Sequence, residues 1–278
     1  MAKRKLSMSL IVLIVAATTL VSGTYAWFLV GGFAELFDLG FDVIEAGGGI
    51  EIQGSNGDAY RSNGGEKVSW GSYLDFDNFK PGTDILVKDT GKYAPVSSAN
   101  GSSFKKVGLE GSYFKMLSGG AQPGVDYNDF VIKIRSDNDQ TVNAKMKIVL
   151  SGDQDALDAA RISVAYNGAA PTIYAANDTS CEAVTGDIPD STVYDSNGDA
   201  IVSSGDTNYG YVSAQSITKL TQDGTNYQVE HDLPNVPANS SSADIAVRIW
   251  MEGNDSDCIG TKLPQKKLNV KITFGSAE

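Results

Sequence analysis

Four oxygen-bearing side chains in a polar stretch are the strongest candidates for chemistry in this sequence. Asp195, Asn197 and Asp199 occupy alternate positions, and Asp206 stands at the twelfth position counted from Asp195. Carboxylate and amide oxygens at this spacing are typical of calcium loops, although Ala200 stands where such a loop has its turn glycine. Calcium is therefore the one cofactor that the residues suggest.

The same stretch also fits a β-hairpin, and the sequence favours this reading. The hairpin would run from Val193-Tyr194 to Ile201-Val202, with Asn197-Gly198 as its turn. A second acidic turn carries Glu252, Asp255 and Asp257, and it is a weaker metal candidate.

The histidine and cysteine inventory argues against an enzyme. The chain has one histidine, His231, between Glu230 and Asp232 and just before Leu233-Pro234, which reads as a strand end. We interpret it as a surface histidine, because triads and zinc sites need a nucleophile or further ligands beside it. We therefore predict no catalytic residues, and a secreted protease is disfavoured.

The two cysteines, Cys181 and Cys258, are an even number in a chain that we expect to be exported. Their pairing in a disulfide is the prediction, and two reduced, partly buried thiols are the alternative.

The first 26 residues have the pattern of a signal peptide. A basic start with Lys3 to Lys5 precedes an apolar run from Leu10 to Leu20. Small residues then lead to a cleavage site between Ala26 and Trp27. The alternative is an uncleaved anchor, because the apolar stretch continues to Val30. We expect a secreted protein that meets signal peptidase during export and meets the membrane only through this leader.

The formal net charge of −12 and a pI of about 4.5 exclude some partners. Such an acidic chain repels nucleic acid and anionic lipid, and it suits a soluble outer surface.

Short alternating strands dominate residues 49–278. The pattern is clearest in Phe130–Arg135, Val142–Leu150, Arg161–Tyr166, Ala243–Met251 and Leu268–Phe274. One short helix is expected over Asp153–Ala160, with Asp153 as its N-cap. We predict an all-β fold, an antiparallel, jelly-roll-like β-sandwich with long loops, preceded by an N-terminal apolar helix.

Residues 27–48 form an apolar segment between the leader and this domain. Large apolar side chains recur on one face at a period of two: Phe33, Phe37, Leu39, Phe41 and Val43. These side chains must be buried by something. They either form the first strand of their own domain or add to the sheet of a neighbouring subunit as a donor strand.

Three motifs resemble the TasA/camelysin family of exported bacterial proteins. The stretch Ser22–Phe28 is similar to the cleavage site of that family, and Asn78–Asp84 to its Lys-Pro-Gly-Asp turn. The stretch Arg248–Asp255 is similar to a late strand and turn in related surface proteins. The resemblance implies a jelly roll that assembles into extracellular fibres of a biofilm matrix, with one subunit's N-terminal strand completing the next subunit's sheet.

We therefore expect a cell-surface structural protein whose main partner is itself, in a homopolymer. The alternative is a monomeric adhesin or ligand-binding module whose long polar loops carry recognition.

Overall fold

The computed structural model describes residues 38–74, 95–98, 100–110, 113–176, 193–194, 200–201, 217–253 and 266–277. Strands dominate these residues, and the one helix among them is α2 (Gln154–Ala159). The predicted all-β class is confirmed.

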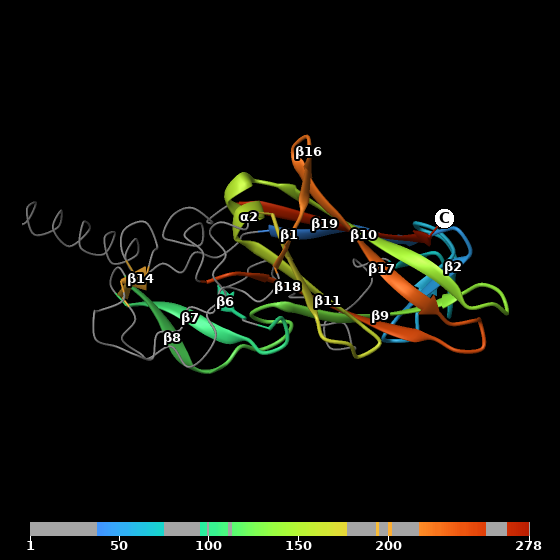
Figure 1. Cartoon of the computed structure of the whole chain (residues 1–278), viewed down its shortest axis with the longest axis horizontal. Coiled ribbons are helices and arrows are strands. Elements are labelled where there is room, and N and C mark those ends of the chain that lie inside the picture. The colour runs from blue at the N-terminus through green and yellow to red at the C-terminus, as the bar shows by residue number, and fades with distance from the viewer. Residues whose placement is uncertain are drawn as a thin grey trace, which may run out of the picture.

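The larger sheet has eight strands, and its central members are long. Its order is β16 (Thr221–Asp223), β17 (Asn226–Val236), β10 (Val142–Gly152), β19 (Lys267–Ser276), β1 (Asp38–Ala46), β5 (Tyr73–Leu74), β3 (Ala59–Tyr60) and β4 (Lys67–Val68). Figure 1 shows β10, β19 and β1 running side by side.

A second sheet has six strands. Its order is β15 (Ile217–Lys219), β12 (Thr172–Ala175), β11 (Ala160–Tyr166), β18 (Ala243–Met251), β9 (Asn128–Ser136) and β2 (Ile50–Gly54). Two smaller sheets are formed by β6 (Val96–Ser97), β7 (Lys105–Glu110) and β8 (Tyr113–Gly120), and by β13 (Val193–Tyr194) with β14 (Ala200–Ile201).

Both large sheets are mixed, so the expectation of a purely antiparallel fold is wrong. Strand β1 runs parallel to β19, and β12 runs parallel to β15. A parallel pair needs a long connection between its strands. This condition is met for β1 and β19, because nearly the whole domain separates them in the sequence.

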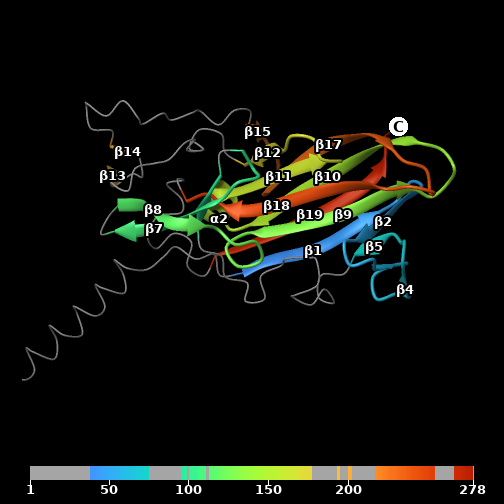
Figure 2. The same cartoon turned by 90° about the horizontal axis from the view of Figure 1, so that it is seen from below.

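One hydrophobic core joins the two large sheets. The predicted stripes of β10, β18 and β19 are confirmed, since Met146, Ile148, Val247, Val270 and Ile272 are all fully buried. Residues of both sheets belong to this one cluster. Figure 2 shows strands of the two sheets lying over one another in this region.

A smaller cluster covers the outer side of the six-stranded sheet. Phe104 stacks on Tyr127 with ring centroids 3.9 Å apart, and it meets the edge of Trp250 at 5.1 Å. Ser163 on β11 donates its hydroxyl proton to the Gly101 carbonyl oxygen at 2.9 Å. Strand β11 is thus buried on both faces from Ala160 to Ala165.

Helix α2 confirms the predicted short helix, with Asp153 at the N-cap position. The Asp153 side chain makes no capping bond. Its Oδ2 instead accepts a hydrogen bond from the Lys267 backbone nitrogen at 2.8 Å, which ties the helix start to β19.

Candidate functional site

Strand β1 carries all three of the described residues for which we predicted a contact between subunits, Leu39, Phe41 and Val43. It pairs with β19 from Asp38 opposite Lys267 to Ala46 opposite Phe274. The strand order places β1 on the side of β19 that is away from β10. The structure thus places β1 in its own chain's sheet, as in the alternative in which it is the first strand of its own domain.

A β-bulge interrupts the pairing of β1 with β19. The register shifts between Phe41 and Val43, so Asp42 is an extra residue. Leu39 and Phe41 lie opposite Leu268 and Val270, but Val43 lies opposite Lys271. The single stripe predicted from Phe33 to Val43 stays a prediction. Phe33 and Phe37 lie outside the described residues.

Beyond the bulge, Ile44 packs in the hydrophobic core. It lies opposite Ile272, and both side chains are fully buried. Two backbone hydrogen bonds hold the end of the strand, from Ala46 N to Ser72 O at 2.8 Å and from Gly47 N to Phe274 O at 3.0 Å. Removal of β1 would therefore leave this backbone edge of β19 unpaired and would take Ile44 away from its place beside Ile272 in the core.

The turn after β1 depends on glycine. Gly48 and Gly49 have φ of 62° and 78°, in the left-handed region that glycine adopts without strain. A Cβ on Gly48 would lie 3.0 Å from the Ser276 nitrogen, and one on Gly49 would lie 3.2 Å from Asp137 Oδ1. Gly47–Gly49 thus form a tight turn that carries the chain from β1 to β2.

The edge of β1 away from β19 is only partly paired. Strand β5 pairs with it at Ile44 and Glu45 alone. Within the described ranges, no strand pairs with Asp38–Val43 on that side. An edge of this kind presents backbone donors and acceptors to a further strand.

Several predicted sites fall outside the described residues. These are the calcium candidates Asp195, Asn197, Asp199 and Asp206, the cysteines Cys181 and Cys258, and the cleavage-site residues Ala26 and Trp27. The competing hairpin prediction is confirmed in its strands, because Val193 pairs with Ile201 and Tyr194 with Ala200. Among the residues that are described, no three acidic, His or Cys side chains gather as a metal site.

Glu252, the described member of the second acidic turn, is a buried anchor. It is 2 % exposed and accepts hydrogen bonds from Trp250 Nε1 at 3.0 Å and from the Ser98 nitrogen at 3.4 Å. These bonds connect β18 to the segment after β6. Asp255 and Asp257 lie outside the described residues.

His231 is half-buried inside a strand, so its interpretation as a surface histidine at a strand end is wrong. Strand β17 continues through Pro234 to Val236, and His231 lies opposite Met146 of β10. Its Nδ1 shares a short hydrogen bond with the Tyr174 hydroxyl of β12. Burial lowers the pKa of His231, against the opposing effect of Asp232, and burial raises the pKa of Tyr174 to about 12.

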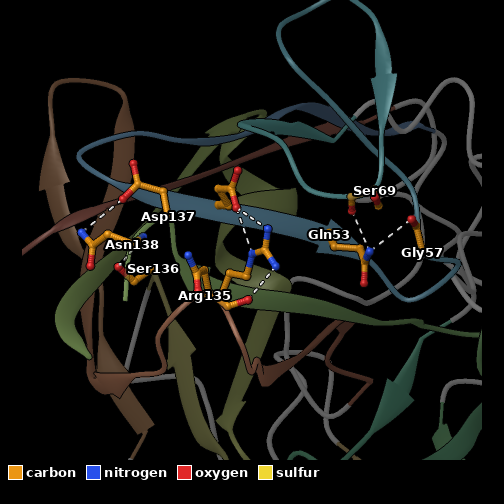
Figure 3. A network of polar contacts seen from close by, with 9 residues as sticks. Gln53, Gly57, Ser69, Arg135, Ser136, Asp137 and Asn138 are labelled. Atoms are coloured by element: carbon orange, nitrogen blue, oxygen red, sulfur yellow. Dashed lines mark hydrogen bonds and ion pairs between the residues drawn. The ribbon is translucent and has the colours of Figure 1, made fainter. Parts of the chain in front are cut away.

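A polar network at the other end of the sheets involves residues that sequence reasoning missed. Arg135 binds Glu51 Oε2 through Nη2 at 2.7 Å, and its Cζ lies 4.2 Å from the Trp70 ring centroid. Figure 3 shows this arginine on β9 beside Gln53, whose Nε2 donates to the Ser69 and Gly57 carbonyls. The partners are far apart in sequence, and alternation alone gives no signal for such pairing.

This network also involves Trp70, the first residue of a stretch to Asp77 that is rich in aromatic and acidic residues. One face of the Trp70 ring is covered by Arg135, and the nearby donors already bind protein oxygens. The described arrangement therefore fastens β2 to β9 and to the loop at Asn239. Asp75 and Asp77 lie outside the described residues.

Comparisons with known proteins found no match. No protein-family model matches the chain, and no curated protein matches it. The described part of the chain contains no helix with the length and apolar character needed to cross a membrane.

Proposed function

We propose that this chain is an exported cell-surface structural protein whose subunits form extracellular fibres by exchanging their first strand. The observation that carries the proposal is the position of β1. It is a parallel addition to an otherwise antiparallel set, β19-β10-β17, and it pairs with the edge of β19 while its Ile44 is buried in the core.

The edge of β19 can pair with the chain's own β1 or with the same strand of another copy. Backbone pairing with β19 and burial of Ile44 would be the same in both cases. Burying one such aliphatic side chain contributes roughly 1.5–3 kcal/mol before ordering costs. Exchange thus keeps the contacts of the closed chain and adds a link between subunits.

We further propose a jelly-roll sandwich for the domain. The orders β1-β19-β10-β17 and β9-β18-β11-β12 support it, because successive strands pass between the two sheets in the alternation typical of jelly rolls. The parallel direction of β1 is the departure from that pattern. It fits a strand that is added to the roll, as the resemblance to the TasA/camelysin family implies.

The remaining parts of the proposal rest on sequence. They are export through the leader of residues 1–26, cleavage before Trp27, the Cys181–Cys258 disulfide and calcium binding at Asp195–Asp206. N-terminal sequencing and intact mass of the secreted protein would test the first three. Calcium titration calorimetry without heat would reject the last.

A complementation experiment tests strand exchange. The chain starting at Gly47 lacks β1, and a synthetic peptide of residues 33–46 supplies it. We expect the truncated chain to form no filaments in electron microscopy and to bind the peptide. A peptide with Ile44→Asp is the matched control, and it should bind much more weakly, because a carboxylate would enter the core. Filaments that persist without β1 would contradict the proposal.

A monomeric adhesin is the second candidate, and the pairing of β1 within its own sheet favours it. In that case the mature chain stays monomeric at high concentration in size-exclusion chromatography, and a glycan array or cell-binding assay detects recognition by the monomer.

A further inference from the structure

Asparagine followed by glycine is the dipeptide most open to spontaneous deamidation. The glycine nitrogen bonds to the asparagine Cγ, the bond from Cγ to the amide nitrogen breaks, and ammonia leaves with the proton from the glycine nitrogen. Water then opens the resulting succinimide to aspartate or isoaspartate. Glycine permits the attack because no side chain shields its nitrogen.

The described residues contain four such pairs, which share a sequence but differ in structure. They are Asn56-Gly57, Asn63-Gly64, Asn100-Gly101 and Asn167-Gly168. Because their local sequence reactivity is similar, the fold should decide which of them reacts.

The pair at Asn100 is protected on both reacting groups. The Gly101 nitrogen donates a buried hydrogen bond to Ser98 Oγ at 3.0 Å. Asn100 Oδ1 accepts hydrogen bonds from the Ser102 and Ser103 nitrogens at 2.9 and 2.8 Å. Both sets of bonds must break before the nitrogen can reach Cγ.

The pair at Asn56 is held in a similar way. The Gly57 nitrogen donates to the Gly54 carbonyl oxygen at 2.9 Å. Asn56 Oδ1 accepts a hydrogen bond from the Asp58 nitrogen at 3.0 Å.

The pair at Asn167 is exposed but lies in a rigid turn. Asn167 and Gly168 have φ of 49° and 77° at the tip of the β11–β12 hairpin. A hydrogen bond from the Ala169 nitrogen to the Tyr166 carbonyl oxygen closes the turn at 3.0 Å. A second one, from the Asn167 nitrogen to the Asp244 carbonyl oxygen at 2.7 Å, ties the turn to β18. Rearrangement of this backbone would disturb two strand pairings.

The pair at Asn63 lies in a turn that is closed by backbone hydrogen bonds, but it has neither the bonds to its reacting groups seen at Asn100 nor the tie to another strand seen at Asn167. It is exposed at the tip of the hairpin between β3 and β4, which have only two residues each. Figure 2 shows this hairpin projecting from the body beside β5. The turn is closed by Gly65 N to Ser62 O at 2.9 Å, and a Cβ on Gly64 would meet nothing within 4 Å. No described hydrogen bond holds the Asn63 side chain or the Gly64 nitrogen.

We propose that Asn63 is a site of spontaneous deamidation through attack by the Gly64 nitrogen. The product adds one negative charge beside the exposed Arg61–Glu66 ion pair. In the isoaspartate form it also lengthens the backbone of the turn, so the β3–β4 pairing weakens. A long-lived extracellular chain would accumulate this change with age at one defined position.

The test follows deamidation of the folded chain in mildly alkaline buffer by isotope-resolved peptide mass spectrometry. Trypsin releases Asn63 in the peptide Ser62–Lys67 and Asn100 in the peptide Tyr93–Lys105. We expect Asn63 to react at least about tenfold faster than Asn100, the factor that corresponds to one hydrogen bond. In urea the two rates should become similar, which shows that the fold causes the difference.

The substitution Ser98→Ala gives a matched second measurement. It removes the acceptor of the Gly101 N–H, so it should speed deamidation at Asn100 and leave the rate at Asn63 unchanged. Equal rates at Asn63 and Asn100 in the folded wild-type chain would overturn the proposal. So would a rate at Asn63 that rises strongly when the chain unfolds.

Discussion

At the scale of single residues, the pair His231 and Tyr174 links the two large sheets. His231 lies on β17 and Tyr174 on β12, and their rings meet edge to face at 5.9 Å. The chain has no other histidine. Titration of this one ring is therefore the simplest source of a stability change between about pH 5 and 8.

Burial lowers the pKa of His231 in the folded chain below the ordinary value of 6.5, although Asp232 acts in the opposite direction. The unfolded chain therefore binds the proton at a higher pH than the folded one. The contribution of His231 to stability is fully present above the unfolded pKa, and it is lost as the pH falls through the folded pKa.

Loss of this contribution should lower the melting temperature of the wild-type chain as the pH falls. We predict that the melting temperature of His231→Gln decreases less over the same pH range. Thermal unfolding of both proteins across about pH 5 to 8 measures it. Asp244→Asn, which changes an exposed carboxylate elsewhere, is the control and should keep the wild-type slope. The same slope in wild type and His231→Gln would show that the ring is not the titrating group.

Sequence reasoning could not find this pair. A histidine between two acids reads as exposed, and its partner lies far away in the sequence. Its burial follows from how β12 and β17 face each other, which no local pattern contains.

At the scale of elements, alternation predicted the strands that have one wet face. Val142–Leu150 and Leu268–Phe274 gave clear stripes, and both are confirmed within β10 and β19. The pattern was less informative where a second layer covers the sheet. On β18, Trp250 shares the side opposite the core stripe, yet it is 1 % exposed because Phe104 and its neighbours cover it.

The bulge in β1 could not be predicted from the sequence for a different reason. One extra residue changes the face of every side chain after it, and periodicity does not show where a bulge falls. Ile44, which the predicted set did not include, is fully buried next to the bulge.

We predict that Ile44→Ala destabilises the monomeric chain by about 2–5 kcal/mol, because it leaves a cavity in a fully buried position. Urea unfolding measures the loss. Glu45→Ala is the neighbouring control. It removes a half-exposed ion pair with Lys271 at 3.7 Å and should cost less than about 1 kcal/mol. Similar effects of the two substitutions would mean that β1 contributes little to the core.

At the scale of the whole molecule, the class of the fold could be predicted from the residues, but its topology could not. The strands could be located from their own residues, whereas the parallel partner of β1 lies at the other end of the domain. The order of strands therefore had to come from the structure. The strand order shows that β1 can be paired within its own sheet. The remaining functional question is whether β1 pairs with β19 of its own chain or with β19 of another copy.

The most direct test of strand exchange is a cross-link between β1 and β19. Glu45 and Thr273 lie opposite each other, so Glu45→Cys with Thr273→Cys places two thiols across the joint. The single variant Glu45→Cys and the wild type control for the native Cys181 and Cys258.

Filaments of the double variant are oxidised and then run on a denaturing gel without reductant. Strand exchange predicts a ladder of covalent multimers that collapses to monomer on reduction, because each link joins β1 of one copy to β19 of the next. A single band of internally cross-linked monomer from the same filaments would contradict strand exchange.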